Sequence, residues 1–220
     1  MKLECLDAQI VVTADAHNPT VLNPDFLSSN IIVPKEWAWT AKEPIITTPA
    51  FSQVTYGNGV YITVEPLRLR VVDPAFNGEP ATSKIADIAG KYASVLQHVK
   101  YTAVGTNFRM FIPMGDPDEY LKAKFVKEGP WYGSQHTPIA AGLKLTYGLQ
   151  TNGRLLLEFS SVTLKRNLVK TETGIIIGSN FHRECGVSPA RDVSEHVRHF
   201  ADDWTRNLDF VREVLALDGV

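Results

Sequence analysis

The most regular hydrophobic pattern in the chain lies between residues 143 and 165. Apolar side chains occupy every second position over residues 143–149, and they do so again from residue 155 onward. A period of two residues is typical of a strand that buries one face. Asn152 and Gly153 stand between the two runs, and such a pair favours a tight hairpin turn. The pattern predicts a β-hairpin, and a later apolar run, GIIIG, predicts a further strand.

The end of the chain carries a second pattern, with helical spacing. One apolar stripe recurs at intervals of three or four residues, through Val193, Val197, Phe200, Trp204, Leu208, Val211 and Leu215. This spacing predicts one long amphipathic helix that packs against the core. Asp192, followed three residues later by Glu195, fits a capping box and predicts the start of the helix there.

The first half of the chain shows patterns in the same order. A strand is expected over residues 6–13. Alternating runs surround a second Asn-Gly pair, Asn58–Gly59, and continue to residue 72, with an interruption at Pro66 that indicates an edge or a bulge. An amphipathic helix is expected from Thr82 or Ser83, with its apolar stripe reaching residue 99.

A long alternating strand, residues 102–112, connects the two halves, and Asp116 before Pro117 predicts a short capped helix through Leu121. Strands grouped before helices predict an α+β fold, in which two long amphipathic helices pack on one side of an antiparallel sheet or sheets. We expect a single domain over residues 1–220. The repeated order suggests an internal duplication of hairpin-strand-helix units, about 1–115 and 116–220, which share one core. The alternative is that the two halves use the same Asn-Gly hairpin sequence independently, without a duplication.

Composition and charge restrict the classes of protein to consider. The chain has 44% hydrophobic residues, 21% charged residues and a net charge of −2. A nearly neutral chain argues against a nucleic-acid partner. Two cysteines form no disulfide framework, no secretory segment is recognised, and the longest early apolar run is too short to cross a membrane. We therefore expect a cytoplasmic protein with no membrane partner.

His182, Cys185, His196 and His199 form the most suggestive cluster for chemistry, because paired histidine and cysteine side chains can bind zinc. The alternative is a strand-end histidine, a small buried thiol and two surface imidazoles. Cys185 could instead act as a nucleophile beside a histidine, although no family signature surrounds it. Phosphate-binding loops, nucleophile elbows and dinucleotide fingerprints are lacking. The sequence assigns no catalytic residue and no cofactor.

Two further groups of residues suggest binding. Asn107 and Arg109 give the long strand an unusually polar face, and Trp37 and Trp39 have the spacing of neighbours on one strand face. A pocket between sheet and helices, lined by these side chains, would suit a carboxylate or a phosphate. Solvated strand residues and aromatic residues that cap the core are the structural alternative.

An exposed loop over residues 128–138 carries Trp131 and Tyr132, and large apolar side chains on a surface favour a contact with another protein. The unpaired backbone groups at the edge of a hairpin also favour contact with another protein. We therefore favour a non-enzymatic protein-interaction or oligomeric module that binds a second copy or another protein. A small anionic-ligand-binding protein is the first alternative, and a metal-dependent enzyme is the second.

Several short segments of the sequence resemble those of a bacterial family of uncharacterised, sporadically distributed proteins. They are His17-Asn18-Pro19, Leu22-Asn23-Pro24-Asp25-Phe26-Leu27, Ile32-Val33-Pro34 and Thr48-Pro49-Ala50-Phe51-Ser52-Gln53-Val54. The later succession of helix, strand, hairpin and closing helix is similar as well. The resemblance implies a bacterial protein and brings no known activity.

Overall fold

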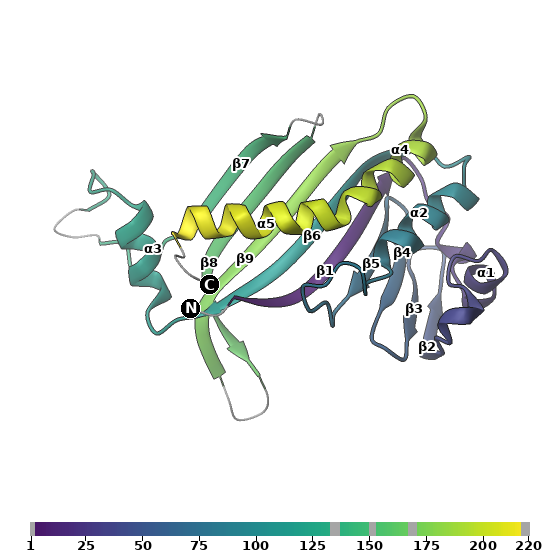
Figure 1. The fold of residues 1–220 in the computed structure, drawn as a ribbon, viewed down its shortest axis with the longest axis horizontal. Coiled ribbons are helices and arrows are strands. Elements are labelled where there is room, and N and C mark those ends of the chain that lie inside the picture. The colour runs from purple at the N-terminus through teal and green to yellow at the C-terminus, as the bar shows by residue number, and fades with distance from the viewer. Residues whose placement is uncertain (1–2, 133–136, 150–152, 167–170, 217–220) are drawn as a thin grey trace.

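One antiparallel sheet organises the part of the chain that the computed structural model describes, which comprises residues 3–132, 137–149, 153–166 and 171–216 (Figure 1). Within these residues the sheet has nine strands in the order β2-β3-β4-β5-β1-β6-β9-β8-β7. The strands are β1 (Glu4–Ala14), β2 (Ala41–Thr47), β3 (Ser52–Tyr56), β4 (Tyr61–Glu65), β5 (Arg68–Asp73), β6 (Tyr101–Pro113), β7 (Leu143–Leu149), β8 (Gly153–Lys165) and β9 (Thr171–Glu184).

The strands confirm the alternating patterns of the sequence. The Asn58–Gly59 pair connects β3 to β4, and Gly59 has the positive φ of 92° that the turn requires. The second hairpin pairs β7 with β8, although Asn152 lies outside the described residues. The α+β class and the antiparallel sheet are therefore as expected. β2 was not foreseen.

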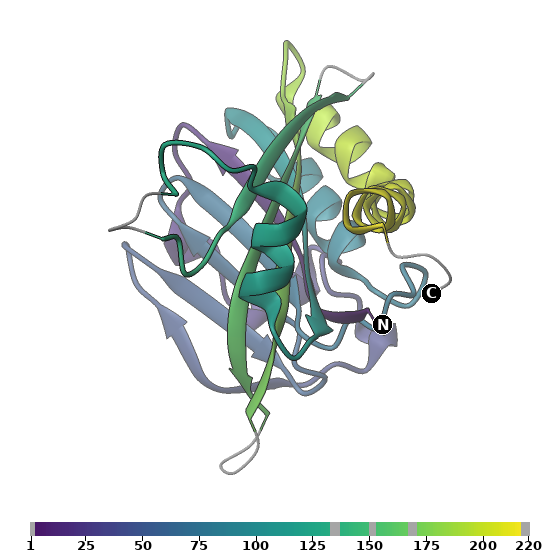
Figure 2. The ribbon, with the colours of Figure 1, turned by 90° about the vertical axis from the view of Figure 1, so that its left-hand side faces the viewer.

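Five α-helices accompany the sheet in the described residues. They are α1 (Pro24–Ser29), α2 (Ile85–Val95), α3 (Pro117–Phe125), α4 (Pro189–His196) and α5 (Phe200–Leu215), with 3₁₀ turns at Pro19–Val21, Lys35–Trp37 and Val197–His199. α2, α4 and α5 lie on one side of the sheet (Figures 1 and 2). α3 contacts β8 and β9, and the Tyr120 hydroxyl donates to the Leu215 carbonyl at the end of α5 at 2.7 Å. None of the described helices combines the length and the apolar character that crossing a membrane requires.

The closing helix differs from its prediction in two ways. It begins at Pro189, three residues before Asp192, and the Asp192 carboxylate accepts a hydrogen bond from the backbone N–H of Gly186 instead of closing a capping box. The single long helix is in fact two, because the 3₁₀ turn at Val197–His199 separates α4 from α5. The short helix α3 was predicted correctly, with Asp116 accepting from the Glu119 N–H at 3.0 Å.

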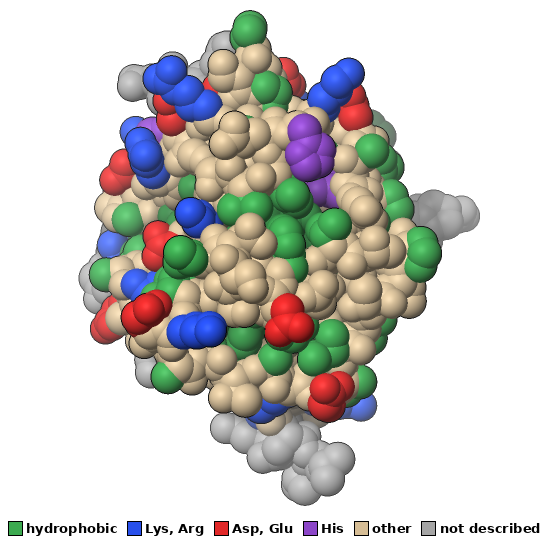
Figure 3. Space-filling view, turned by 90° about the vertical axis from the view of Figure 1, so that its right-hand side faces the viewer, with side chains coloured by type: hydrophobic (Ala, Val, Ile, Leu, Met, Phe, Trp, Pro, Cys, Tyr) green, Lys and Arg blue, Asp and Glu red, His purple; other side chains and the backbone are tan. Residues whose placement is uncertain are grey.

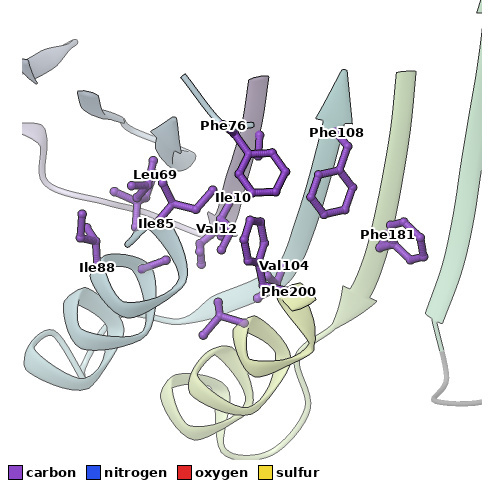
Figure 4. Close-up of a cluster of buried hydrophobic side chains, with 14 of the residues drawn as sticks. Ile10, Val12, Leu69, Phe76, Ile85, Ile88, Val104, Phe108, Phe181 and Phe200 are labelled. Atoms are coloured by element: carbon purple, nitrogen blue, oxygen red, sulfur yellow. The ribbon is translucent and has the colours of Figure 1, made fainter. Parts of the chain in front are cut away.

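The hydrophobic core lies between the helices and the sheet (Figure 4). Ile10 and Val12 of β1 and Phe108 of β6 point from the sheet toward α2 and the start of α5. Buried side chains of both halves belong to this one cluster. Because neighbouring strand residues face opposite sides, the residues between these positions lie on the other face of the sheet, which we call the outer face.

Two buried polar contacts attach α5 to β9. Arg183 of β9 donates two hydrogen bonds to the Asp203 carboxylate, at 2.7 and 2.5 Å, and both side chains are at most 2% exposed. One helical turn further on, Ser179 and Asn207 form a second buried hydrogen bond. Each contact joins one strand residue to one helix residue, so together they determine how α5 lies across the sheet.

Candidate functional site

The register of the strands arranges the outer face in rows. One row runs across five strands, through Asp7, Arg109, Gly178, Glu158 and Lys144. Its charged side chains form pairs between neighbouring strands, and the glycine separates the two pairs. Formal charges along the row cancel, so this part of the outer face is polar without being strongly basic.

Arg109 is held in place by the first of these pairs. Its Nε donates to the Asp7 carboxylate at 2.7 Å, and Nη2 contacts the same oxygen. The Asp7 side chain is only 8% exposed, whereas that of Arg109 is 57% exposed. A buried carboxylate therefore fixes an exposed guanidinium, whose Nη1 forms no hydrogen bond with the residues that the structure describes.

A shallow pocket of about 320 Å³ lies beside Arg109. Gly178 contributes no side chain to its floor, and Lys144 and Glu158 stand across it, joined at 3.4 Å. The other lining residues are Gly142, Leu143, Phe159, Ser160 and Ile176. The carboxylate of a small ligand could bind the Arg109 guanidinium in this pocket, where it would share the guanidinium with Asp7.

Asn107 lies in the neighbouring row and is occupied by hydrogen bonds. Its side-chain oxygen accepts from Asn180 Nδ2 at 2.5 Å, and its Nδ2 donates to the Gly105 carbonyl at 3.1 Å. Asn107 and Arg109 therefore share a surface, as the sequence indicated. That surface is the outer face, and the prediction that they line a pocket between sheet and helices is wrong.

Trp37 and Trp39 lie elsewhere and belong to no strand. Trp37 ends a 3₁₀ turn, and Ala38 adopts a left-handed conformation with φ 53° before Trp39. The two rings are 5.0 Å apart, and Trp39 packs against Tyr56 of β3. The expectation of two indoles on one strand face is therefore wrong. This pair packs against the core and does not contribute to the pocket beside Arg109.

The suggested metal ligands are not brought together. Within the described ranges no group of three or more histidine, cysteine, aspartate or glutamate side chains is placed to hold a metal ion. His182 lies on the outer face beside Arg154, which adds to burial in lowering the pKa of its imidazole. His196 Nε2 instead contacts the backbone carbonyl of Glu184 at 3.0 Å. The His196 imidazole thus binds the end of β9, whereas the His182 side chain lies on the outer face of the sheet.

Cys185 does not have the environment of a nucleophile. Burial, followed by the charge of Asp192, raises the pKa of its thiol to about 11. A thiol with so high a pKa is almost entirely protonated near neutral pH, and the thiolate is the reactive form. The half-buried thiol is consistent with the structural alternative.

The aromatic loop is partly exposed, as expected. The Trp131 side chain lies at the surface, with its residue 55% exposed, and its indole N–H donates to the Lys127 carbonyl at 3.0 Å. Tyr132 is half-buried. Residues 133–136, which follow directly, lie outside the described residues.

β7 forms one edge of the sheet, a position that the sequence did not indicate. Strand order places β7 at one end of the sheet, with β8 as its neighbour on one side. Its side chains alternate between half-buried Leu143, Leu145, Tyr147 and Leu149 and exposed Lys144, Thr146 and Gly148. Figure 2 looks onto this end of the molecule, with α3 in front, and Figure 3 looks onto the opposite end, where hydrophobic side chains gather beside a histidine near the centre of the view. The hairpin pattern predicted β7, but it could not predict which strand ends the sheet.

In the described part of the chain, the fold and these surfaces define an α+β protein with one antiparallel sheet, α2, α4 and α5 on one face and charged pairs on the outer face. Comparison with protein-family models, curated proteins and solved structures found no match to this chain. Functional inference therefore depends on the surfaces themselves.

Proposed function

We propose that this protein is a non-enzymatic interaction module that assembles by adding a strand to the open edge of β7. The observation that carries this proposal is the regularity of that edge. Over residues 143–149 every residue pairs in register with β8, so the alternate backbone groups that point away from β8 form an even row of donors and acceptors. Such a row is a ready template for another strand.

The opposite edge of the sheet supports the same choice by contrast. β2 contains Pro44, which has no N–H to donate, and its pairing with β3 is irregular between Lys42 and Ile46. Prolines, charges and irregular pairing are common ways to block an edge strand. The chain therefore protects one end of its sheet and leaves the other regular.

A groove beside β7 offers room for side chains of an added strand. It measures about 390 Å³ and lies between the end of β7 and α5, where the Phe210 ring packs at a tilt against Tyr147 with 4.9 Å between ring centroids. Its remaining lining comes from Gly148, Leu149, Arg206, Asp209 and Glu213. Main-chain pairing would provide affinity, and this groove would select the side chains.

Order within the fold also supports an internal duplication, which we infer as part of this proposal. β1 and β6 pair at the centre of the sheet, and each leads through a proline-started helix, α1 or α3, into an antiparallel meander and then into helices on the inner face. Asn58–Gly59 lies in the second turn of the first meander, between β3 and β4, and Gly153 begins β8 in the second meander. We assign the module to a bacterial cytoplasm, which the resemblance and the two free thiols support.

Assembly is tested by light scattering after size exclusion over a range of protein concentrations. We expect a species of at least twice the 24.4 kDa chain mass, which dissociates on dilution. Hydrogen exchange then locates the contact. Backbone amides of β7 should be protected at high concentration and exchange faster on dilution, whereas those of β2 serve as the internal control. A protein that stays monomeric, or that assembles without protecting β7, contradicts the proposal.

A second candidate function is the binding of a small carboxylate or phosphate beside Arg109. The exposed guanidinium, oriented by buried Asp7, favours it. Citrate and inorganic phosphate should raise the melting temperature of the wild type, and Arg109→Gln should abolish the increase. Arg70→Gln is the matched control, because Arg70 lies on the same face outside the pocket. Equal increases in all three proteins would refute a site at Arg109.

A further inference from the structure

We propose that the strand added to β7 is β7 of a second copy, paired antiparallel with Thr146 on the two-fold axis. This inference rests on the proposed function and names the partner of that edge. Two nine-stranded sheets would then join into one continuous sheet. Such a contact is isologous, because the same strand contributes the same residues from both copies.

The two faces of β7 make it complementary to itself. A two-fold axis perpendicular to the sheet keeps the α5 side of one copy beside the α5 side of the other. Leu145 then lies opposite Tyr147 of the partner subunit, and Leu143 lies opposite its Leu149. All four side chains are half-buried in the described chain, so pairing extends an apolar layer that already packs against the core.

Length selects the register. β7 has seven residues, and only an axis at its central residue, Thr146, pairs all seven with the partner strand. Moving the axis to Leu145 or Tyr147 leaves two residues of each strand without a partner. The groove beside α5 fits the same register, because Leu143 of the second copy lies next to Leu149, which lines the groove.

The outer side of the strand accepts this register without a clash of charges. Thr146 meets Thr146, a pair that antiparallel sheets favour. Lys144 meets Gly148 of the partner subunit, and a Cβ built on Gly148 has no other atom within 4 Å. The absence of a side chain at this position leaves the lysine free to remain paired with Glu158 of its own chain.

Single cysteines on the exposed side of β7 test the register. Oxidation of Thr146→Cys should give a covalent dimer, because residues on the axis face each other at about 4.5–5.5 Å between Cα atoms. Lys144→Cys and Gly148→Cys should each fail to crosslink with themselves, since four residues separate the two copies by about 13–14 Å. A mixture of these two variants should form the mixed disulfide. Burial raises the pKa of Cys5 to about 12 and that of Cys185 to about 11, which keeps the background of native thiols low.

Charge exchange at the same position gives a test that needs no crosslink. Thr146→Lys and Thr146→Glu should each weaken self-association by up to about fivefold, because like charges meet on the axis. A mixture of the two should restore the dimer. The Thr146 side chain is exposed in the single chain, so both variants are expected to fold, and circular dichroism checks this.

The outcomes separate the two proposals. Concentration-dependent assembly with protection of β7, combined with crosslinking at Thr146 and rescue by the mixed charges, supports both. Assembly through β7 in which Thr146→Cys does not crosslink, or in which Thr146→Lys dimerises like the wild type, overturns the register and leaves strand addition standing. A monomer at every concentration overturns both.

Discussion

Arg183 and Asp203 place two opposite charges inside the protein, where each depends on the other. Asp203→Ala should lower the free energy of unfolding by about 3–5 kcal/mol, because it leaves the guanidinium buried without its partner. Urea denaturation measures this loss. Asp202→Ala, the exposed neighbour on the same helix, is the matched control and should change stability by less than about 0.5 kcal/mol.

The double variant Arg183→Met, Asp203→Leu separates the pair from the packing around it. Replacement of both charges by apolar side chains of similar size is often neutral or stabilising, since it removes the cost of burying them. We expect it to recover most of the stability that Asp203→Ala loses. A double variant as unstable as Asp203→Ala would show that the ion pair itself stabilises the attachment of α5.

His17 makes stability depend on pH. Burial lowers the pKa of its imidazole below 6.5, and its Nε2 lies 3.3 Å from the Val12 carbonyl. Below pH 6.5 the unfolded chain therefore binds the proton more readily than the folded chain, and stability falls as pH falls, by at most about 1.4 kcal/mol per pH unit. Well above pH 6.5 the imidazole is neutral in both the folded and the unfolded chain, so protonation of His17 no longer lowers the free energy of unfolding.

His17→Gln should reduce the difference in unfolding free energy between about pH 7.5 and about pH 5.5. Urea denaturation of both proteins at both pH values measures it, and the other histidines act alike in the two. An unchanged difference between wild type and variant would mean that His17 titrates at the same pH in the folded and unfolded chains.

At the scale of single residues, the sequence predicted polarity better than location. It correctly grouped Asn107 with Arg109, because residues two apart on a strand must share a face. It could not tell which face the helices cover, since a polar strand face can border a pocket or solvent equally well. The prediction that Trp37 and Trp39 share a strand face was wrong for another reason. Spacing of two implies a shared face only inside a strand, and Ala38 turns the chain between them.

At the scale of elements, periodicity predicted the strands and most of the helices. It could not reveal the division between α4 and α5, because an apolar stripe keeps its spacing through one tight turn. Different tertiary contacts hold the chain before and after this break. A Cβ on Gly90 of α2 would lie 3.2 Å from the Val197 side chain, so the 3₁₀ turn that follows α4 packs closely against α2. Asp203 holds α5 to β9 instead. Tertiary contacts thus set the direction of each segment.

Gly174 allows β6 and β9 to approach each other at their ends. A Cβ at this position would come within 2.2 Å of the Ile112 carbonyl oxygen and within 2.6 Å of the Phe111 ring. Gly174→Ala should therefore cost about 2–3 kcal/mol, since the backbone of the sheet must move. Gly148→Ala is the control, because its Cβ meets nothing within 4 Å, and it should be neutral or slightly stabilising.

Chemical denaturation of both glycine variants measures the contrast. Equal stability of the two would mean that the ends of β6 and β9 adapt without cost, and that the close approach at Gly174 does not restrict the sheet.

At the scale of the whole molecule, the order of the strands was beyond the sequence. Alternation identifies a strand and its buried face, but it carries no information about which strands are neighbours across long connections. The open edge of β7 therefore became visible only with the assembled sheet. The pairing of β1 with β6 likewise joins segments about a hundred residues apart, and no local pattern specifies it.

That central pairing predicts that the two halves unfold together. β1 and β6 share a ladder along nearly their full length, and side chains of both halves fill one core cluster. Opening either half would therefore expose the apolar face of the other. In native-state hydrogen exchange with increasing urea, the slowest amides of β4 and of β8 should converge on one unfolding free energy with the same urea dependence. Two separate values, with one half opening first, would instead indicate that each half retains a stable core of its own.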